Sequence, residues 1–114
     1  MDQKLKEAQF KALLGYHQSA LSLLNSAQGD PKDMYFSVTK ARIYLNLGMP
    51  EEAIKTFDEL GIGGYNSVKE GMSDEDCYKL WITMQVMAKA FLMNNEPKSA
   101  QVCINECKKV WEKL

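Results

Sequence analysis

A short pattern occurs three times in this chain, and it restricts the fold more than any other feature of the sequence. The pattern is a residue that tolerates a positive φ angle, followed five residues later by Ala, at Gly15–Ala20, Gly48–Ala53 and Asn95–Ala100. Gly and Asn are the residues that close helices in the left-handed conformation. Pro50 and Pro97 then occupy the expected first turn of a new helix, where a missing N–H costs nothing. Each segment is therefore predicted to be the tight turn of a helical hairpin, with Ala where the two helices pack closely.

The spacing of the three alanines predicts how the hairpins divide the chain. Ala20 and Ala53 lie 33 residues apart, whereas Ala53 and Ala100 lie 47 apart. The excess of about 13 residues coincides with the Gly-rich stretch 61–73, which is predicted to be an inserted loop before the third hairpin. The length of 114 residues suits one domain. We predict a single domain, 1–114, with units at about 1–29, 30–60 and 73–114.

The segments that flank the turns carry apolar residues at helical spacing. Ala53, Ile54, Phe57 and Leu60 recur three and four residues apart, which is typical of one face of an α-helix. Residues 78–93 are apolar around much of the helix circumference, so this helix is expected to be buried on more than one side. No segment shows a competing strand pattern. The expected fold class is therefore all-α.

Capping residues indicate where two of the helices begin. Asp30–Pro31 is a plausible cap and first-turn proline for the third helix. Ser73, followed by three acidic residues at 74–76, predicts the start of the fifth, because negative charge is favoured at the positive end of the helix dipole.

The hairpin residues resemble the tetratricopeptide repeat (TPR) family. The best-matching unit consists of Ala41, Tyr44, Gly48, Ala53, Phe57 and Leu60. The third unit follows with Ala88, Phe91, Asn95, Ala100, Ile104 and Cys107. The first is weaker, because Lys11 stands where the family prefers an aromatic residue, and the resemblance as a whole covers about 90 of the 114 residues. It implies a right-handed α-solenoid of about three antiparallel helix pairs, with an inserted loop before the third pair.

The same resemblance implies where a partner would bind. In TPR proteins the first helix of each pair lines a concave groove that receives a segment of another protein. Carried over by register, the groove residues are Leu5, Gln9, Leu13, Tyr35, Val38, Arg42, Leu45, Asn46, Ile82, Gln85, Lys89, Leu92 and Met93. This set is largely apolar with two cations, Arg42 and Lys89, and suits an apolar or amphipathic helical segment. The other interpretation of apolar members such as Leu5 and Val38 is that they belong to the core.

Trp111 is a separate candidate for contact with a partner. Aromatic residues at helical spacing, such as Tyr44 and Phe57, more often belong to the core. Trp111 differs because its helix is the last one, and aromatic residues dominate interface hot spots. We therefore predict a terminal interface at Trp111, through which the C-terminal helix could associate with another copy.

The sequence contains no constellation that predicts catalysis. Cys103 and Cys107 lie one helical turn apart, but a metal site needs further ligands, and only Cys77 and His17 remain. The cysteines are predicted to be buried free thiols and His17 to be solvated in the first turn. The Gly-rich stretch lacks the Gly-Lys-Ser/Thr ending of a phosphate-binding loop. We predict no enzyme, no catalytic residue, no metal and no cofactor.

Charge and hydropathy limit the partners and the compartment. Fourteen basic residues against fifteen acidic ones argue against a nucleic-acid surface, and no apolar run approaches the roughly 20 residues that span a bilayer. The N-terminal sequence has no signal-peptide core, and an odd number of cysteines does not suggest a disulfide framework. The expected location is therefore cytoplasmic.

Two classes of function remain open. The first is a non-enzymatic protein–protein interaction module that acts as a scaffold, adaptor or chaperone, for instance a small secretion-type chaperone. Binding in the manner of heat-shock chaperone co-factors is disfavoured, because Leu5 and Gln9 replace the Lys and Asn of the family's carboxylate clamp. The alternative is a pentatricopeptide-like RNA-binding helical repeat, which the segment 48–61 also resembles. Three unevenly spaced units and a net charge of −1 weigh against that alternative.

Overall fold

The chain is all-helical over the part that the structure describes. The computed structural model describes residues 3–30, 33–60 and 73–113, and these ranges contain helices but no strand. The helices are α1 (Gln3–Leu13), α2 (His17–Ser26), α3 (Met34–Asn46), α4 (Pro50–Leu60), α5 (Asp74–Met93) and α6 (Pro97–Lys113). The all-α prediction is confirmed. Apart from Ser73, the predicted inserted loop lies outside the described residues.

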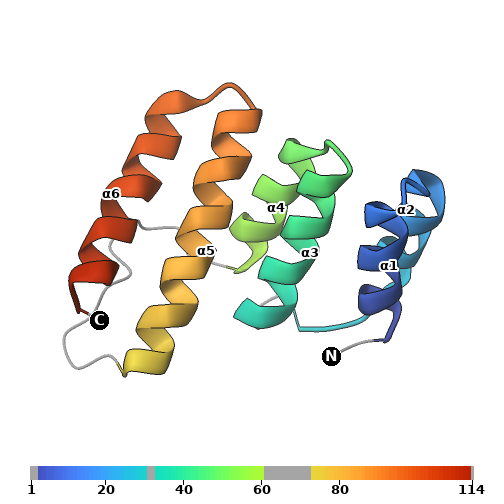
Figure 1. Cartoon of the computed structure of the whole chain (residues 1–114), viewed down its shortest axis with the longest axis horizontal. Coiled ribbons are helices and arrows are strands. Elements are labelled where there is room, and N and C mark those ends of the chain that lie inside the picture. The colour runs from blue at the N-terminus through green and yellow to red at the C-terminus, as the bar shows by residue number, and fades with distance from the viewer. Residues whose placement is uncertain (1–2, 31–32, 61–72, 114) are drawn as a thin grey trace.

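The helices are arranged as three hairpins that lie side by side along the long axis of the molecule (Figure 1). Each hairpin pairs neighbours in the chain, namely α1 with α2, α3 with α4, and α5 with α6. Between hairpins, α3 packs on both α1 and α5, and α4 packs on α5. The result is an elongated body of 41 × 30 × 21 Å in which the middle hairpin joins the other two.

The three hairpin turns have the same backbone conformation. Gly15, Gly48 and Asn95 all have positive φ angles, of 88°, 72° and 60°. In each turn this residue donates its N–H to the carbonyl three residues back, at 3.0–3.2 Å, and the next residue donates to the carbonyl five residues back, at 2.8–2.9 Å. This pair of bonds is the Schellman motif, which satisfies carbonyls at the end of a helix. The prediction of three helix-closing residues is confirmed.

The alanine of each turn is at the point of closest packing. Ala20, Ala53 and Ala100 have no exposed surface. Each donates its N–H to the carbonyl four residues back, which belongs to the residue immediately after the left-handed one. One residue therefore completes the first helix with its N–H and caps the second with its C=O. Because this leaves so little chain between the helices, only a small side chain fits where they meet.

The starts of α3 and α5 are fixed by side-chain caps. The Asp33 carboxylate accepts the N–H of Tyr35 at 3.2 Å, and the Ser73 hydroxyl accepts the N–H of Asp76 at 3.2 Å. Ser73 confirms the predicted start of the fifth helix. The prediction of Asp30 as the cap of α3 is wrong. Gly29 and Asp30 are not helical, and the ring of Phe36 lies directly against the backbone of Gly29, where an added Cβ would overlap it.

The core runs through all three hairpins and is densest around α5. Its buried residues Cys77, Leu80, Met84, Met87 and Phe91 form one stripe along the helix, and Thr83, Val86 and Ala90 form a second stripe beside it. The helix packs on α3, α4 and α6. The prediction that this helix is buried on more than one side is confirmed. Among the described residues, no helix is both long enough and apolar enough to cross a membrane.

Replacing Gly48 with Ala should lower the free energy of unfolding by about 1 kcal/mol, because a Cβ disfavours positive φ. Nothing lies within 4 Å of that Cβ, so the loss would come from the backbone alone. Gly48→Asn should cost less, since Asn95 adopts the same conformation in the third turn. Urea denaturation of both variants measures the difference, and an Ala variant as stable as the parent would show that the left-handed turn is not required.

Candidate functional site

Two open pockets lie along the junction of α3 and α5, and together they form a groove. The first, of about 120 Å³, is lined by Met34, Tyr35, Val38, Thr39, Arg42, Lys79, Ile82 and Thr83. The second, of about 280 Å³, is lined by Arg42, Leu45, Asn46, Gln85, Val86 and Lys89. Both helices run in the same direction in Figure 1, so the first pocket lies along their N-terminal halves and the second along their C-terminal halves. Arg42 belongs to both pockets, and we call the combined surface the α3–α5 groove.

The groove follows from the spacing of residues on the two helices. On α3, Tyr35, Val38 and Arg42 recur three and four residues apart, and Leu45 and Asn46 continue the same face. On α5, the lining residues between Lys79 and Lys89 recur with the same spacing. One face of each helix therefore borders the opening along about three turns.

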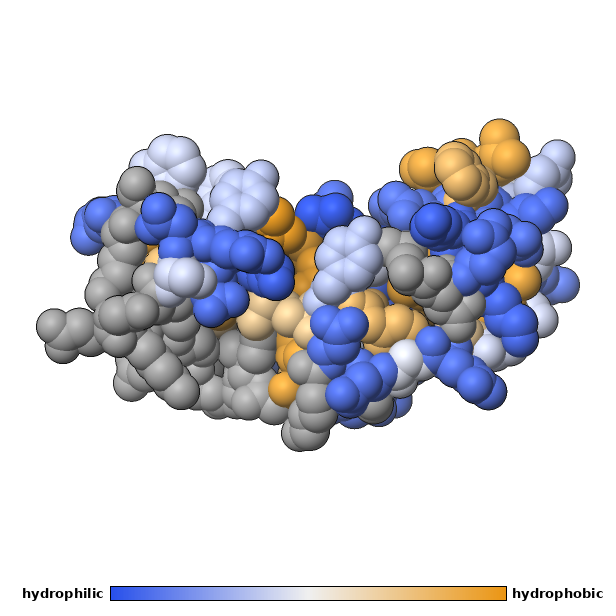
Figure 2. Space-filling view, turned by 90° about the horizontal axis from the view of Figure 1, so that it is seen from below, coloured by the Kyte–Doolittle hydropathy of each residue, from blue (hydrophilic) through white to orange (hydrophobic). Residues whose placement is uncertain are grey.

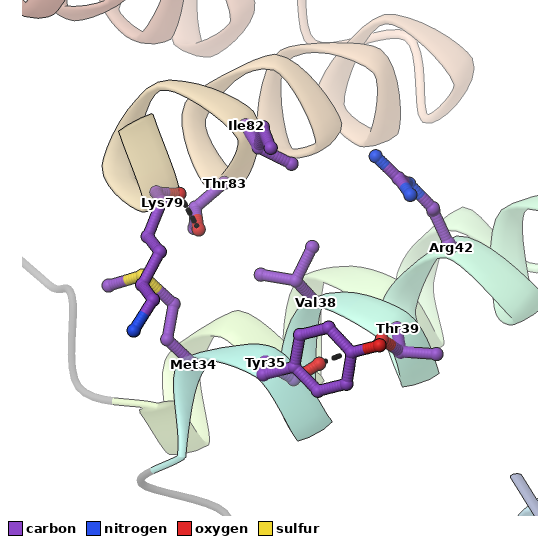
Figure 3. A pocket seen from close by; sticks show the side chains of 8 residues that line it. All are labelled: Met34, Tyr35, Val38, Thr39, Arg42, Lys79, Ile82 and Thr83. Carbon is purple, nitrogen blue, oxygen red and sulfur yellow. Dashed lines mark hydrogen bonds between the residues drawn. The ribbon is translucent and has the colours of Figure 1, made fainter. Parts of the chain in front are cut away.

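The floor of the groove is apolar in the first pocket, whereas the second pocket is lined mainly by polar side chains around Leu45 and Val86. Figure 3 shows Val38 on α3 pointing toward Ile82 on α5 across the first pocket. The hydroxyl of Thr39 donates to the carbonyl of Tyr35, and that of Thr83 to the carbonyl of Lys79, each at 2.8 Å. Since these hydroxyls are satisfied within their own helices, they make no demand on a ligand for a hydrogen bond.

The rim of the groove is polar and cationic. Arg42, Lys79 and Lys89 are exposed, and no Asp or Glu is among the described residues that line either pocket. Lys79 pairs with Glu75 at 3.3 Å, although both side chains are largely exposed. Within the described ranges, Arg42 and Lys89 have no ion-pair partner. Two cations therefore face the opening, with no neutralising carboxylate among the residues that the structure describes.

The structure brings together eight of the thirteen predicted groove residues. They are Tyr35, Val38, Arg42, Leu45, Asn46, Ile82, Gln85 and Lys89. Val38 and Leu45 are 7% and 6% exposed, so they form the floor and also belong to the core. The prediction missed five lining residues, Met34, Thr39, Lys79, Thr83 and Val86. Lys79, Thr83 and Val86 share the helical spacing of the residues that were identified on α5, and this spacing could have found them.

The other five predicted residues do not line the groove. Leu5 is fully buried, so its assignment to a binding surface is wrong: it faces inward from α1 and joins the core. Gln9 is half-buried on α1 but lines neither pocket. Leu13, Leu92 and Met93 are exposed at the C-terminal ends of α1 and α5, beyond the two pockets.

Apolar side chains also project at the end of the molecule that carries α1 and α2. Phe10, Leu13, Leu14 and Tyr16 are each more than half exposed. Figure 2 shows apolar side chains gathered at this end, and the outline of the molecule dips between it and the end that carries α5 and α6. Leu13 therefore belongs to this end surface rather than to the α3–α5 groove.

A second cluster of aromatic residues lies on the last hairpin. The ring of Trp81 on α5 is 5.7 Å from that of Tyr78 and 5.3 Å from that of Trp111 on α6, measured between centroids. Trp111 is 59% exposed, and an open pocket beside it includes Ile104 and Cys107. We call this the α6 outer surface.

The thiols are wholly or partly buried, and the single histidine is exposed. All three cysteines are free; Cys77 and Cys103 are buried and Cys107 is half-buried. Burial is the main cause that raises the pKa of the Cys103 thiol to about 11, and the nearby Cys107 and Glu106 add smaller contributions. His17 is exposed at the first residue of α2, as predicted. Residues 3–30, 33–60 and 73–113 contain no cluster of three His, Cys, Asp or Glu side chains that could hold a metal ion.

Comparison with known proteins adds no relative. No protein-family model matches the chain, and neither the search of curated proteins nor that of solved structures found a match.

Cys103 should resist alkylation at a pH where exposed thiols react readily. Its folded pKa lies above the ordinary value of 9.0, so the folded state holds the proton more tightly than the unfolded state. The associated stability is fully present below about pH 9 and is lost as the pH rises through about 11. Reaction with iodoacetamide at pH 9, followed by peptide mapping, should be slow at Cys103 in the folded protein and fast in urea. Equal rates in the two states would contradict its burial.

Proposed function

We propose that this protein is a non-enzymatic interaction module that holds an apolar or amphipathic segment of another protein in the α3–α5 groove. The observation that carries the proposal is the construction of the groove, in which an apolar floor with satisfied hydroxyls lies beneath a rim of exposed polar side chains. Binding sites for protein segments combine an apolar centre with a polar edge in this way. A scaffold, an adaptor or a chaperone, including a small secretion-type chaperone, would use such a surface.

The proposal includes a TPR-like architecture, a right-handed α-solenoid of helix pairs. It is supported by the three identical hairpin turns and by the packing of α3 against both α1 and α5. In that arrangement α1, α3 and α5 are the first helices of the three pairs. The α3–α5 groove would then be the part of the concave face that lies between the second and third pairs.

The length of the groove fits a short helix. The 13 residues of α3 correspond to about 20 Å of helix, or somewhat more than three turns. A partner helix of similar length would place residues i, i+3, i+4 and i+7 along the floor. An extended segment would satisfy fewer of its own backbone carbonyls there, because the hydroxyl protons of Thr39 and Thr83 are already donated within their own helices.

We also propose that the α6 outer surface contacts a second copy of the chain. Lys108 and Glu112 border the pocket beside Trp111, one helical turn apart. If two copies of α6 packed antiparallel about a two-fold axis, Lys108 of each would face Glu112 of the other. The exposed ring of Trp111 would then be covered by the same surface of the second copy.

A photoreactive residue at position 35 should capture the partner. Replacing Tyr35 with p-benzoylphenylalanine places the reactive group at the groove, and irradiation in a native extract should give a covalent adduct with one polypeptide. The control is the same substitution at Tyr16, which is equally exposed (58% against 60%) but lies outside the groove. Mass spectrometry identifies the adducts, and identical adducts from both positions would place the binding site elsewhere.

Trp111→Ala should weaken self-association without unfolding the chain, because the ring is mostly exposed. Sedimentation velocity over a concentration series should show dimer for the parent protein and monomer for the variant. A parent protein that stays monomeric throughout the series would contradict the contact between copies and leave the α3–α5 groove unaffected.

A further inference from the structure

We infer that the segment held in the α3–α5 groove is an amphipathic helix whose polar flanks are acidic. The inference rests on the proposed function and adds the charge of the partner to it. It is carried by the distribution of charge between the helices that line the groove and the helix behind them.

Beyond the acidic first turn of α5, at Asp74, Glu75 and Asp76, charge is segregated between the lining helices and α4. From Met34 to Asn46 and from Cys77 to Met93, the only charged residues are Lys40, Arg42, Lys79 and Lys89. The helix α4, by contrast, carries Glu51, Glu52, Asp58 and Glu59 against the single cation Lys55. A chain with a net charge of −1 thus presents only cations along these lengths of α3 and α5. Segregation of this kind is expected where a charged partner approaches from one side.

The cations are placed at the edges of the apolar floor, where flanking carboxylates of a helix would lie. Figure 3 shows Arg42 extending from α3 toward α5, and Lys79 extending from α5 beside Met34. Lys79 and Lys89 are ten residues apart on α5, which is about 15 Å along the helix axis. An acidic residue near each end of a three-turn helix would therefore reach a cation while its apolar stripe rests on Val38 and Ile82.

Arg42 and Lys89 should contribute more than Lys79 to the preference for a helix with acidic flanks. Lys79 already pairs with Glu75 in the free protein, so a ligand carboxylate would have to compete with that contact. Arg42 and Lys89 have no ion-pair partner among the described residues. Arg42 is also the one residue common to both pockets, so its guanidinium can be reached along most of the groove.

A protein helix fits the groove better than a nucleic acid does. A single-stranded nucleic acid needs aromatic rings on which bases stack and cations that follow its phosphates. Among its described lining residues the groove offers one exposed aromatic ring, Tyr35, and the floor of its first pocket is apolar rather than cationic. The acidic surface of α4 behind the groove would also repel phosphates that ran past its edge.

Three synthetic peptides of about 14 residues test the inference. All share one stripe of Leu at i, i+3, i+4 and i+7, have blocked termini, and carry Glu, Gln or Lys on the flanks of that stripe. Fluorescence anisotropy at low salt should give the tightest binding for the Glu peptide, then Gln, then Lys, and added salt should reduce the difference. A single-stranded oligouridylate serves as the nucleic-acid probe.

Substitutions in the rim assign the preference to named residues. Arg42→Gln and Lys89→Gln should each weaken the binding of the Glu peptide about two- to fivefold, as expected for exposed charges. Neither substitution should change the affinity for the Gln peptide. The matched control is Lys6→Gln with Lys98→Gln, which removes two exposed cations on α1 and α6, outside the groove. This control should bind all three peptides like the parent protein. Circular dichroism and thermal unfolding confirm that each variant is folded.

The outcomes separate the inference from the proposed function. Equal binding of the Glu and Gln peptides, both weakened by Ile82→Asn, would refute the acidic partner and retain the groove as a binding site. Binding of no peptide, with a specific adduct still formed at position 35, would also refute the acidic helix. Loss of that adduct would refute the groove itself. Tighter binding of the oligouridylate than of the Glu peptide, lost in the Arg42→Gln variant, would replace the protein partner with RNA.

Discussion

The structure depends on the closure of each hairpin by a left-handed residue and a buried alanine. Two backbone hydrogen bonds end the first helix, and the residue that completes them caps the second, so the helices have almost no freedom to separate. Because the small side chain of Ala53 is fully buried between α3 and α4, these two helices approach each other closely. The middle hairpin then acts as one unit, and α3 is held where its outward face borders α5. The groove lies between two hairpins that are each closed in this way.

Much of the fold could be predicted from sequence because its determinants are local. Whether Gly15, Gly48 and Asn95 adopt positive φ depends on the residue itself and its immediate neighbours, and all three do. The start of α3 could not be predicted in this way. Asp30 and Asp33 are both competent caps, and the start at Asp33 is accompanied by the packing of Phe36 on Gly29. That contact joins residues seven positions apart, and the pattern of capping residues does not contain it.

The residues of the candidate site likewise fall into those that the sequence could predict and those that it could not. Tyr35, Val38 and Arg42 could be identified from spacing, because one face of α3 borders the groove. Leu5 could not, because the face of α1 that is covered depends on how the first hairpin docks on the second, which periodicity does not specify. The apolar character of the groove was predicted, but Thr39 and Thr83 were not identified as lining residues, because they are polar residues whose hydroxyls bond within their own helices.

The unequal packing between hairpins has a consequence for local unfolding. The first hairpin meets the second chiefly through α1 on α3, whereas α5 packs on both α3 and α4. In an array stabilised by contacts between neighbours, the element with the smaller interface opens at the lower free energy. Amide protons of α1 and α2 should therefore exchange through a partial opening that leaves α3 to α6 folded. A ligand bound between α3 and α5 would not suppress that opening, so the two ends of this small protein can differ in dynamics while the groove remains intact.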